Sequence, residues 1–188
     1  FFFFFFFLPA PLESTTGFSS LSMNWSIASN YELASAQAEH QTQPKTHLLG
    51  RIIDAYKAKM DAIAKTVSME MGAPMGLANA AQAPAGLGHL IYAQKALENF
   101  DFTEDVGTSR VIREPIGVCG LITPWNWPVN QITAKVGPAL AAGCTMVLKP
   151  SEIAPLNAIL FAEVMEEAGT PPGVFNVVNG DGPTVGVA

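Results

Sequence analysis

The sequence predicts an α/β fold in which a parallel sheet follows two helices. Between residues 116 and 178, apolar runs rich in β-forming residues alternate with helical segments, and this alternation predicts parallel strands joined by right-handed crossovers. Upstream of that region, apolar residues recur at spacings of three and four, which is typical of an amphipathic helix. The 188 residues, 49% of them hydrophobic, are enough for the core of one domain and few for two.

The first part of the chain, residues 1–43, shows no sustained helical or strand period, so we interpret it as a poorly specified leader. Residues 1–8 are all apolar. This run is shorter than the about 20 residues of a membrane span, and it lacks the basic segment of a secretory signal. We interpret it as an artefact of gene prediction or sequencing and leave it out of the expected fold. We therefore expect a cytoplasmic protein that has no membrane partner.

Two helices are expected next. The first runs from about Pro44 to Gly72-Ala-Pro74, where the glycine and the proline end it. Its buried stripe consists of Leu49, Ile52, Ile53, Tyr56, Met60, Ile63 and Val67, with Met60, Met69 and Met71 as core filler. The second helix is less regular, spans about residues 79–100, and buries Leu87, Leu90, Ile91 and Leu97. His89 lies on it without a Cys, His or carboxylate partner three or four residues further on, so we expect a structural histidine.

The remaining elements follow from local signals. Residues 101–114 are polar and then alternating, which predicts an extended hairpin limb outside the core. After them we expect strands at 116–122, 145–148 and 174–178, separated by helices at about 129–142 and 156–168. The first strand has no polar alternation and is therefore predicted to be buried rather than half-exposed. Gly143 and Gly169 lie just past the two helix ends, where left-handed caps are common.

One asparagine, Asn126, lies in the loop at the carboxyl end of the first strand. Pro124 and Pro128 flank it and fix φ on either side. They bias the residues before them, Thr123 and Trp127, toward extended conformations. An amide held stiffly at such a place can stabilise a developing oxyanion.

Three polar residues, Lys149, Ser151 and Glu152, follow the second strand at its carboxyl end. Open parallel sheets bind ligands outside the carboxyl ends of their strands. A lysine there supplies a cation for phosphate or a donor to ribose hydroxyls, and a glutamate can accept from a vicinal diol and repel an extra phosphate. The sequence therefore indicates a nucleotide site at this edge of the sheet.

Charge and cysteine content exclude several classes of partner. The chain has 10 Lys and Arg against 16 Asp and Glu, a net charge of -6. Such a balance provides neither a basic nucleic-acid footprint nor a polybasic membrane patch. Cys119 and Cys144 lack metal-site spacing, so we interpret them as small buried hydrophobic residues in a reducing compartment, and we expect no metal.

Three segments together resemble the aldehyde dehydrogenase superfamily. They are Arg113 to Pro128, Gly137 to Glu152 and Pro171 to Val178, and the similarity runs from about Leu48 to Ala188. A Pro-Trp-Asn-x-Pro loop followed by a Lys-Pro-Ser-Glu loop is a specific combination. The resemblance implies a partial Rossmann-type NAD(P)-binding domain over residues 44–188, and an enzyme that oxidises an aldehyde to a carboxylic acid through a cysteine thiohemiacetal.

The resemblance also implies roles for individual residues. Asn126 matches the asparagine that stabilises the oxyanion. Lys135 matches a lysine assigned to proton relay, with a structural buried cation as the equal alternative. The positions expected to bind the cofactor are Ile122, Thr123, Pro124, Trp125 and Asn126 at the nicotinamide end, Lys149, Ser151 and Glu152 at the adenine ribose, and Gly182 at the adenine. Glu152 favours NAD, with NADP as the alternative cofactor.

The family's nucleophilic cysteine and general-base glutamate have no counterpart among these 188 residues. We therefore expect an N-terminal fragment without the catalytic domain, inactive by itself. Residues 101–115 match an arm that crosses to a neighbouring subunit in a homodimer or homotetramer, although a simple edge strand is equally compatible with them. Two other hypotheses remain: a naturally short, non-catalytic nucleotide-binding or oligomerisation module, and a relative specific for semialdehydes or for CoA acylation.

Overall fold

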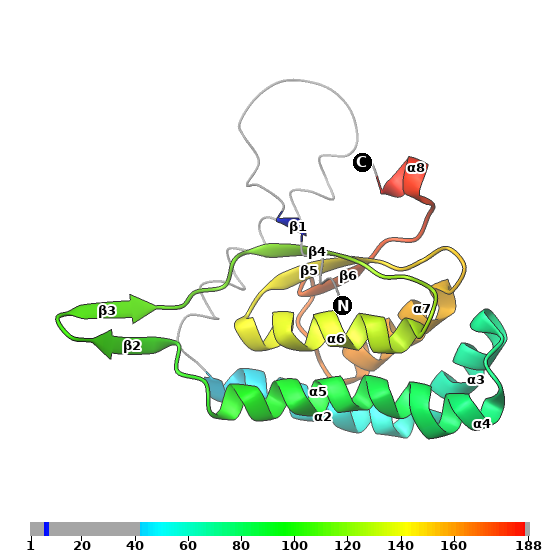
Figure 1. Ribbon diagram of the computed structural model, residues 1–188, viewed down its shortest axis with the longest axis horizontal. Helices are drawn as coiled ribbons and strands as arrows, with labels where there is room; N and C mark the ends of the chain where they lie inside the picture. Colours follow the sequence, from blue (N-terminus) through cyan, green and yellow to red (C-terminus); the bar gives the residue numbers. More distant parts are fainter. Residues whose placement is uncertain (1–5, 8–41, 187–188) are drawn as a thin grey trace.

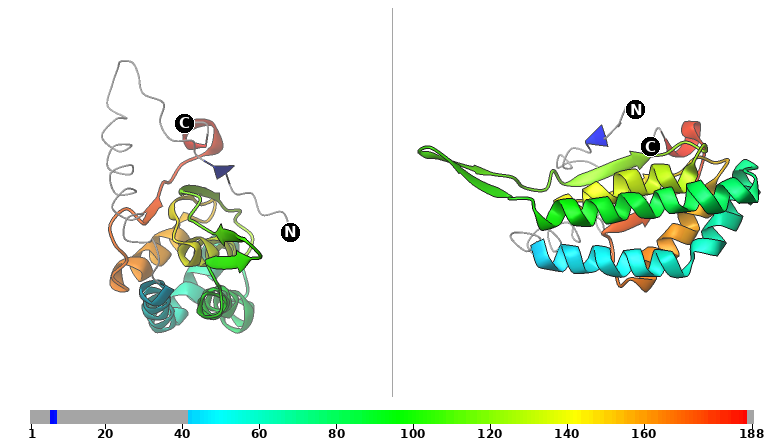
Figure 2. Two further views of the ribbon diagram at one scale, coloured as in Figure 1. Left: turned by 90° about the vertical axis from the view of Figure 1, so that its left-hand side faces the viewer. Right: turned by 60° about the horizontal axis from the view of Figure 1, so that its bottom comes forward.

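The computed structural model describes residues 6–7 and 42–186. Most of the leader predicted over residues 1–43 lies outside the described residues. In the described part a sheet lies over a layer of helices, and a two-stranded hairpin extends from one end (Figures 1 and 2). None of the helices in this part of the chain combines the length and apolar content needed to cross a membrane.

The sheet has the order β1-β4-β5-β6. Its strands are β1 (Phe6–Phe7), β4 (Val118–Ile122), β5 (Thr145–Lys149) and β6 (Phe175–Val177). The last three are parallel and β1 is antiparallel to β4, so the predicted parallel arrangement is confirmed. The strand β1 lies in the apolar run of residues 1–8, which is not part of the expected fold.

The helices α6 (Pro128–Ala142) and α7 (Pro155–Glu167) connect the parallel strands. They end at Gly143 and near Gly169, which have φ values of 87° and 71°, as predicted for left-handed caps. Together with the N-terminal helices they lie on one side of the sheet (Figure 1). Because only one face of β4 meets these helices, the prediction of a fully buried strand is wrong: Cys119 and Leu121 are buried, whereas Ile122 is 48% exposed.

The predicted first helix is two helices, α2 (Thr42–Ala58) and α3 (Met60–Met71). The break is at Lys59, whose N–H donates to the carbonyl oxygens of both Ala55 (3.3 Å) and Tyr56 (3.1 Å) in a tightened turn. All of the predicted stripe except the half-buried Met60 is buried, because the turn keeps both helices facing the same core. Met69 is 76% exposed, so its assignment to the core is wrong.

The predicted second helix consists of α4 (Met75–Leu77), the π-helical turn η1 (Ala78–Gln82) and α5 (Ala83–Glu98). Pro84 lies in the first turn of α5. Its ring has no N–H and would clash with the carbonyl four residues earlier in a regular helix. The widened π turn is located at this point and accommodates the proline.

The predicted hairpin is confirmed as β2 (Thr103–Val106) and β3 (Ser109–Ile112), an antiparallel pair in which every residue is exposed. It projects from the body of the molecule (Figure 2). Two ion pairs cross it, Arg110 with Asp105 at 2.7 Å and Arg113 with Glu104 at 2.7 Å.

Candidate functional site

The carboxyl ends of β4, β5 and β6 meet at one edge of the sheet. Ile122 at the end of β4 is in register with Lys149 at the end of β5. The Thr123 N–H donates to the Lys149 carbonyl (3.2 Å), and the Val178 N–H donates to the Leu148 carbonyl (2.9 Å). The loops after these three strands therefore begin side by side, as the topological rule for parallel sheets predicts.

The loop between β4 and α6 begins buried and then becomes exposed. Thr123 is buried, while the side chains from Pro124 to Trp127 reach solvent. Trp127 has φ 60° and ψ 54° and is the one non-glycine residue with positive φ in the described part of the chain. A non-glycine residue in this region costs about 1–3 kcal/mol, and such residues cluster at functional sites.

The predicted extended conformation of Trp127 is therefore wrong. Its carbonyl accepts the Gln131 N–H (3.0 Å), the first turn of α6. Pro128 opens that helix and disfavours the right-handed helical region for the residue before it. The chain must reverse sharply between the end of β4 and the start of α6, and the left-handed conformation of Trp127 achieves this reversal.

Asn126 lies directly before this strained residue, at the N-terminal end of α6. Its side chain is exposed. A helix N-terminus carries a partial positive charge that stabilises nearby negative charge. The amide and the helix end can therefore act on the same developing oxyanion.

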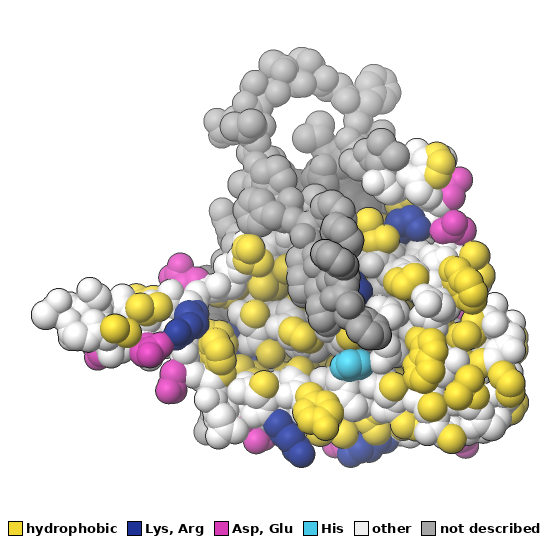
Figure 3. Space-filling model, in the orientation of Figure 1, with side chains coloured by type: hydrophobic (Ala, Val, Ile, Leu, Met, Phe, Trp, Pro, Cys, Tyr) yellow, Lys and Arg dark blue, Asp and Glu magenta, His cyan; other side chains and the backbone are white. Residues whose placement is uncertain are grey.

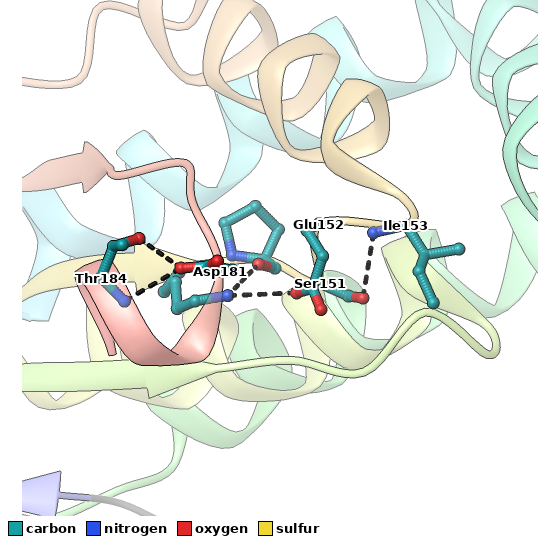
Figure 4. A network of polar contacts seen from close by, with 7 residues as sticks. Ser151, Glu152, Ile153, Asp181 and Thr184 are labelled. Atoms are coloured by element: carbon teal, nitrogen blue, oxygen red, sulfur yellow. Dashed lines mark hydrogen bonds and ion pairs between the residues drawn. The ribbon is translucent and has the colours of Figure 1, made fainter. Parts of the chain in front are cut away.

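The loop between β5 and α7 holds a compact polar network (Figure 4). Lys149 is buried, its Nζ donates to the Pro150 carbonyl (3.0 Å), and it lies 3.6 Å from the Glu152 carboxylate. The Ser151 hydroxyl accepts the Ile153 N–H (3.2 Å). A positive charge and an exposed carboxylate thus lie side by side just beyond the end of β5.

Sequence reasoning missed Asp181, which lies beside this network (Figure 4). Its carboxylate accepts the Thr184 N–H (2.9 Å) and the Thr184 hydroxyl, and so caps the short helix α8 (Gly182–Val185). The hydrogen bonds from Thr184 and, to a smaller extent, the charge of Lys149 lower the pKa of Asp181. An aspartate followed by a proline in the next two residues is a helix-start signal that could have revealed this residue.

Gly182 opens α8 and is exposed. A Cβ built on it would meet no atom of the described residues within 4 Å. The surface at Gly182 is therefore open enough for a flat ligand to approach the backbone. By contrast, a Cβ on Gly180 would collide with Val185, and Gly180 has φ 154°, so the turn itself requires that glycine.

Lys135 lies about two turns into α6, on the buried face that also carries Ile132 and Val136. Burial lowers the pKa of its ammonium group. The structure thus places a desolvated lysine behind the Asn126 loop, and the choice between proton relay and structural cation stays a prediction.

The surroundings of His89, Cys119 and Cys144 agree with the structural roles that we expect for them. His89 Nε2 lies 2.7 Å from Asn130 Oδ1 and connects α5 to α6. Cys119 and Cys144 are free and buried. Among residues 6–7 and 42–186 no cluster of three or more His, Cys, Asp or Glu side chains could hold a metal ion.

Comparison with known proteins gives consistent similarities. The model of the aldehyde dehydrogenase family matches residues 25–188. A 3-succinoylsemialdehyde-pyridine dehydrogenase from a Pseudomonas species is 63% identical over 143 residues, which are 76% of this chain and 30% of that protein.

Solved structures agree. An aldehyde dehydrogenase from Bartonella henselae is 45% identical with a TM-score of 0.82 over 89% of this chain and 36% of its own. A mutant of aldehyde dehydrogenase C from Pseudomonas syringae, in complex with NAD+ and octanal, is 45% identical with a TM-score of 0.83 over 89% of this chain and 35% of its own. The chain thus spans about a third of the length of these relatives.

Proposed function

The chain belongs to the aldehyde dehydrogenase family, and we propose that it supplies the dinucleotide-binding part of an enzyme that oxidises an aldehyde to a carboxylic acid with NAD. The observation that carries this proposal is the register of β4 and β5, in which Ile122 pairs with Lys149. Because of this register, the Asn126 loop begins beside the loop that holds Lys149 and Glu152. One loop is suited to the reacting carbonyl and the other to the cofactor.

The residues at this edge fit a nicotinamide dinucleotide. Lys149 can donate to ribose hydroxyls, and the exposed Glu152 carboxylate can accept from the vicinal diol. The exposed side chains of Ile122, Pro124 and Trp125 offer an apolar surface to a ring, whereas Thr123 between them in the chain is buried and could contact a ligand through its backbone only. The open backbone at Gly182 allows close approach of a second ring.

The preference for NAD over NADP follows from charge. A 2′-phosphate would lie against the Glu152 carboxylate, and like charges at this distance repel. Lys149 is 3.6 Å from that carboxylate and offsets part of the repulsion. We therefore propose NAD as the main cofactor and NADP as a weaker one.

When bound at this edge, NAD would supply the hydride acceptor for oxidation of the aldehyde carbon. Asn126 donates an amide hydrogen to the carbonyl oxygen as its negative charge develops, and the N-terminus of α6 adds to this stabilisation. Trp127 and the flanking prolines keep that amide in place. Lys135 is assigned to proton relay or to a structural role with equal weight.

Cofactor affinities test the assignment. We expect Lys149→Ala to weaken NAD binding about 10- to 100-fold, because a hydrogen bond to a charged group contributes about 1.5–3 kcal/mol. Glu152→Ala is expected to weaken NAD binding and to narrow the gap between the NAD and NADP affinities. Lys57→Ala and Asp54→Ala are matched controls, since these residues form a similar pair at 3.5 Å on an exposed face of α2. Unchanged affinities in the Lys149 and Glu152 variants would show the cofactor assignment to be wrong.

Turnover distinguishes the enzyme from a non-catalytic binding module. No residue of this chain matches the cysteine nucleophile of the family, so the polypeptide of 188 residues alone is expected to give no aldehyde-dependent NADH. The same assay on a protein that also carries such a cysteine is expected to give NADH. Formation of NADH by the 188-residue polypeptide would contradict the expected inactivity. If neither protein formed NADH, the result would favour the non-catalytic binding module.

We also propose that the hairpin of β2 and β3 is an assembly arm in a homodimer or homotetramer. Acidic and basic side chains border exposed apolar ones along it (Figure 3). The two buried free cysteines support the cytoplasmic location that the sequence suggests.

A further inference from the structure

The helix α7 follows the cofactor loop directly and lacks a cap of its own. Its first residue is Pro155, and the preceding Ala154 has no side chain that could accept a hydrogen bond. The N–H groups in the first turn of a helix have no partner within the helix. The N–H groups of Leu156 and Asn157 therefore need an acceptor from elsewhere.

Glu70, near the end of α3, supplies that acceptor. Its Oε1 accepts the Leu156 N–H (2.5 Å), and its Oε2 accepts the Asn157 N–H (2.9 Å) and the side-chain amide of Asn157. Glu70 and Leu156 are 86 positions apart in the sequence. One carboxylate thus satisfies the first turn of a helix that belongs to the other half of the chain.

The position of Glu70 in its own helix is unfavourable. It lies in the last turn of α3, which Gly72 ends in a left-handed cap. Negative charge at a helix C-terminus is destabilising, whereas at a helix N-terminus it is stabilising. The negative charge of Glu70 is therefore stabilised by its contact with the start of α7 and not by its own helix α3.

The opposite end of α7 is held in the complementary way. Arg51 of α2 donates through Nε to the Ala168 carbonyl (2.7 Å), and a positive charge is favourable at a helix C-terminus. Lys59 forms ion pairs with Glu167 (2.9 Å) and Glu163 (3.4 Å) along the same helix. The helices α2 and α3 thus fix α7 at both ends, and only the Glu70 end adjoins the cofactor loop.

The loop itself is a short, internally bonded turn. The Ala154 N–H donates to the Ser151 carbonyl (3.1 Å), and the Ile153 N–H donates to the Ser151 hydroxyl (3.2 Å). These bonds join the start of α7 to Ser151 and its neighbour Glu152. A shift of the first turn of α7 is therefore passed to the residues proposed to contact the ribose.

We propose that Glu70 is a positioning residue of the cofactor site, which fixes the first turn of α7 and through it the loop from Lys149 to Ala154. Glu70 acts at a distance and does not touch the cofactor. The inference rests on the proposed function, since it assigns that loop to NAD.

The test compares charged contacts at the two ends of the same helix. Glu70→Gln keeps the size of the side chain and removes one acceptor oxygen and the charge, whereas Arg51→Met removes the contact at the far end. We expect Glu70→Gln to raise the Kd for NAD about tenfold, within the range that loss of an indirect positioning contact causes at other sites. Both variants are expected to lower the melting temperature by a similar amount. The NAD Kd of Arg51→Met is nevertheless expected to stay within about twofold of wild type.

Hydrogen exchange provides a second readout that does not depend on cofactor. In Glu70→Gln the peptide covering residues 153–160 is expected to exchange faster, and in Arg51→Met it is expected to exchange as in wild type. The ratio of NAD to NADP affinity is also expected to fall in Glu70→Gln, because Glu152 loses its fixed position. Glu70→Ala extends the series, and if that variant fails to fold, Glu70→Gln decides the outcome.

The outcomes separate this inference from the proposed function. If wild type binds NAD and Lys149→Ala weakens that binding, but Glu70→Gln binds as wild type does, the positioning role is wrong and the function stands. Equal loss of NAD affinity in Glu70→Gln and Arg51→Met would also overturn it, since general destabilisation would then be the cause. If wild type does not bind NAD, the proposed function itself fails.

Discussion

Asn126 lies where a strained loop meets the positive end of α6. In a protein that also carries the nucleophilic cysteine, the proposed oxyanion role of Asn126 predicts that Asn126→Ala lowers kcat about 10²–10³-fold, equivalent to about 2.7–4 kcal/mol. The Kd for NAD is expected to rise far less than kcat falls, because Asn126 is one of several residues expected at the nicotinamide end and Pro124, Trp127 and Pro128 fix the backbone of the loop. Steady-state kinetics and NAD titration measure the two quantities.

A matched variant shows whether the effect belongs to this asparagine. Asn79 is an exposed asparagine on η1, and Asn79→Ala is expected to leave kcat unchanged. A wild-type kcat in Asn126→Ala would exclude the oxyanion role. A large rise in the NAD Kd without a change in kcat would instead make Asn126 a cofactor contact.

Cys119 is expected to make the stability of the fold depend on pH in the alkaline range. Burial, and then the neighbouring Cys144, raises the pKa of the Cys119 thiol to about 12, whereas an unfolded cysteine ionises near about 8.5. Between these values the folded state keeps a proton that the unfolded state has lost, so the free energy of unfolding falls as pH rises. Urea unfolding from about pH 8.5 to 11 is expected to show a smaller decline in Cys119→Ala than in wild type. Parallel pH profiles for the two proteins would contradict this prediction.

At the scale of elements, the packing of α2 on α5 depends on one glycine. A Cβ on Gly86 would collide with the Tyr56 hydroxyl and lie 3.1 Å from Tyr56 Cζ, and that hydroxyl donates to the Ala83 carbonyl (2.9 Å). Alanine gains about 1 kcal/mol of helix propensity, but overpacking of this kind costs about 1–3 kcal/mol. We expect Gly86→Ala to lower the free energy of unfolding, measured by denaturant titration.

Gly88 of the same helix is the control. In the part of the chain that the structure describes, no atom lies within 4 Å of a Cβ built on Gly88. Gly88→Ala is therefore expected to stabilise the protein by up to about 1 kcal/mol. If both variants were stabilised, the Tyr56 contact would have room to relax and the packing argument would be wrong.

The same elements explain which features could be predicted from sequence. Periodicity reports which side of a helix is buried, and it located the stripe from Leu49 to Val67 correctly. It does not report a turn such as that at Lys59, because the apolar spacing continues across it. The contact between Glu70 and α7 left no local signal either, since its partners lie 86 positions away.

The loop after β4 shows the limit of local rules in another way. The preference of a residue before proline is a property of the dipeptide, whereas the conformation of Trp127 is imposed by the path from β4 to α6. The meeting of the Asn126 and Lys149 loops could nevertheless be predicted, because it follows from strand order in any parallel sheet. The exposure of one face of β4 could not be predicted, because an apolar sequence does not indicate whether one or both faces of a strand are covered.

At the scale of the whole molecule, the hairpin of β2 and β3 stands out because it exposes apolar side chains that no other part of the described chain covers. Val106 and Ile112 are 54% and 55% exposed, and the hairpin extends away from the body (Figure 1). An isolated two-stranded hairpin is marginally stable in water. Here Arg110 binds both oxygens of Asp105, at 2.7 and 3.0 Å, but exposed ion pairs contribute only about 0–1 kcal/mol.

A neighbouring subunit would bury the apolar side chains of this hairpin, and this leads to a test of assembly. If the hairpin is the proposed assembly arm, Ile112→Lys is expected to shift the protein toward a smaller oligomer, because a lysine would be desolvated in the interface. Light scattering coupled to size-exclusion chromatography measures the mass. Tyr92→Lys replaces another exposed hydrophobic residue, 74% exposed on α5 and outside the hairpin, and is expected to leave the mass unchanged. If Ile112→Lys also kept the wild-type mass, the hairpin would be a simple edge structure, and the apolar residues along it would need another explanation.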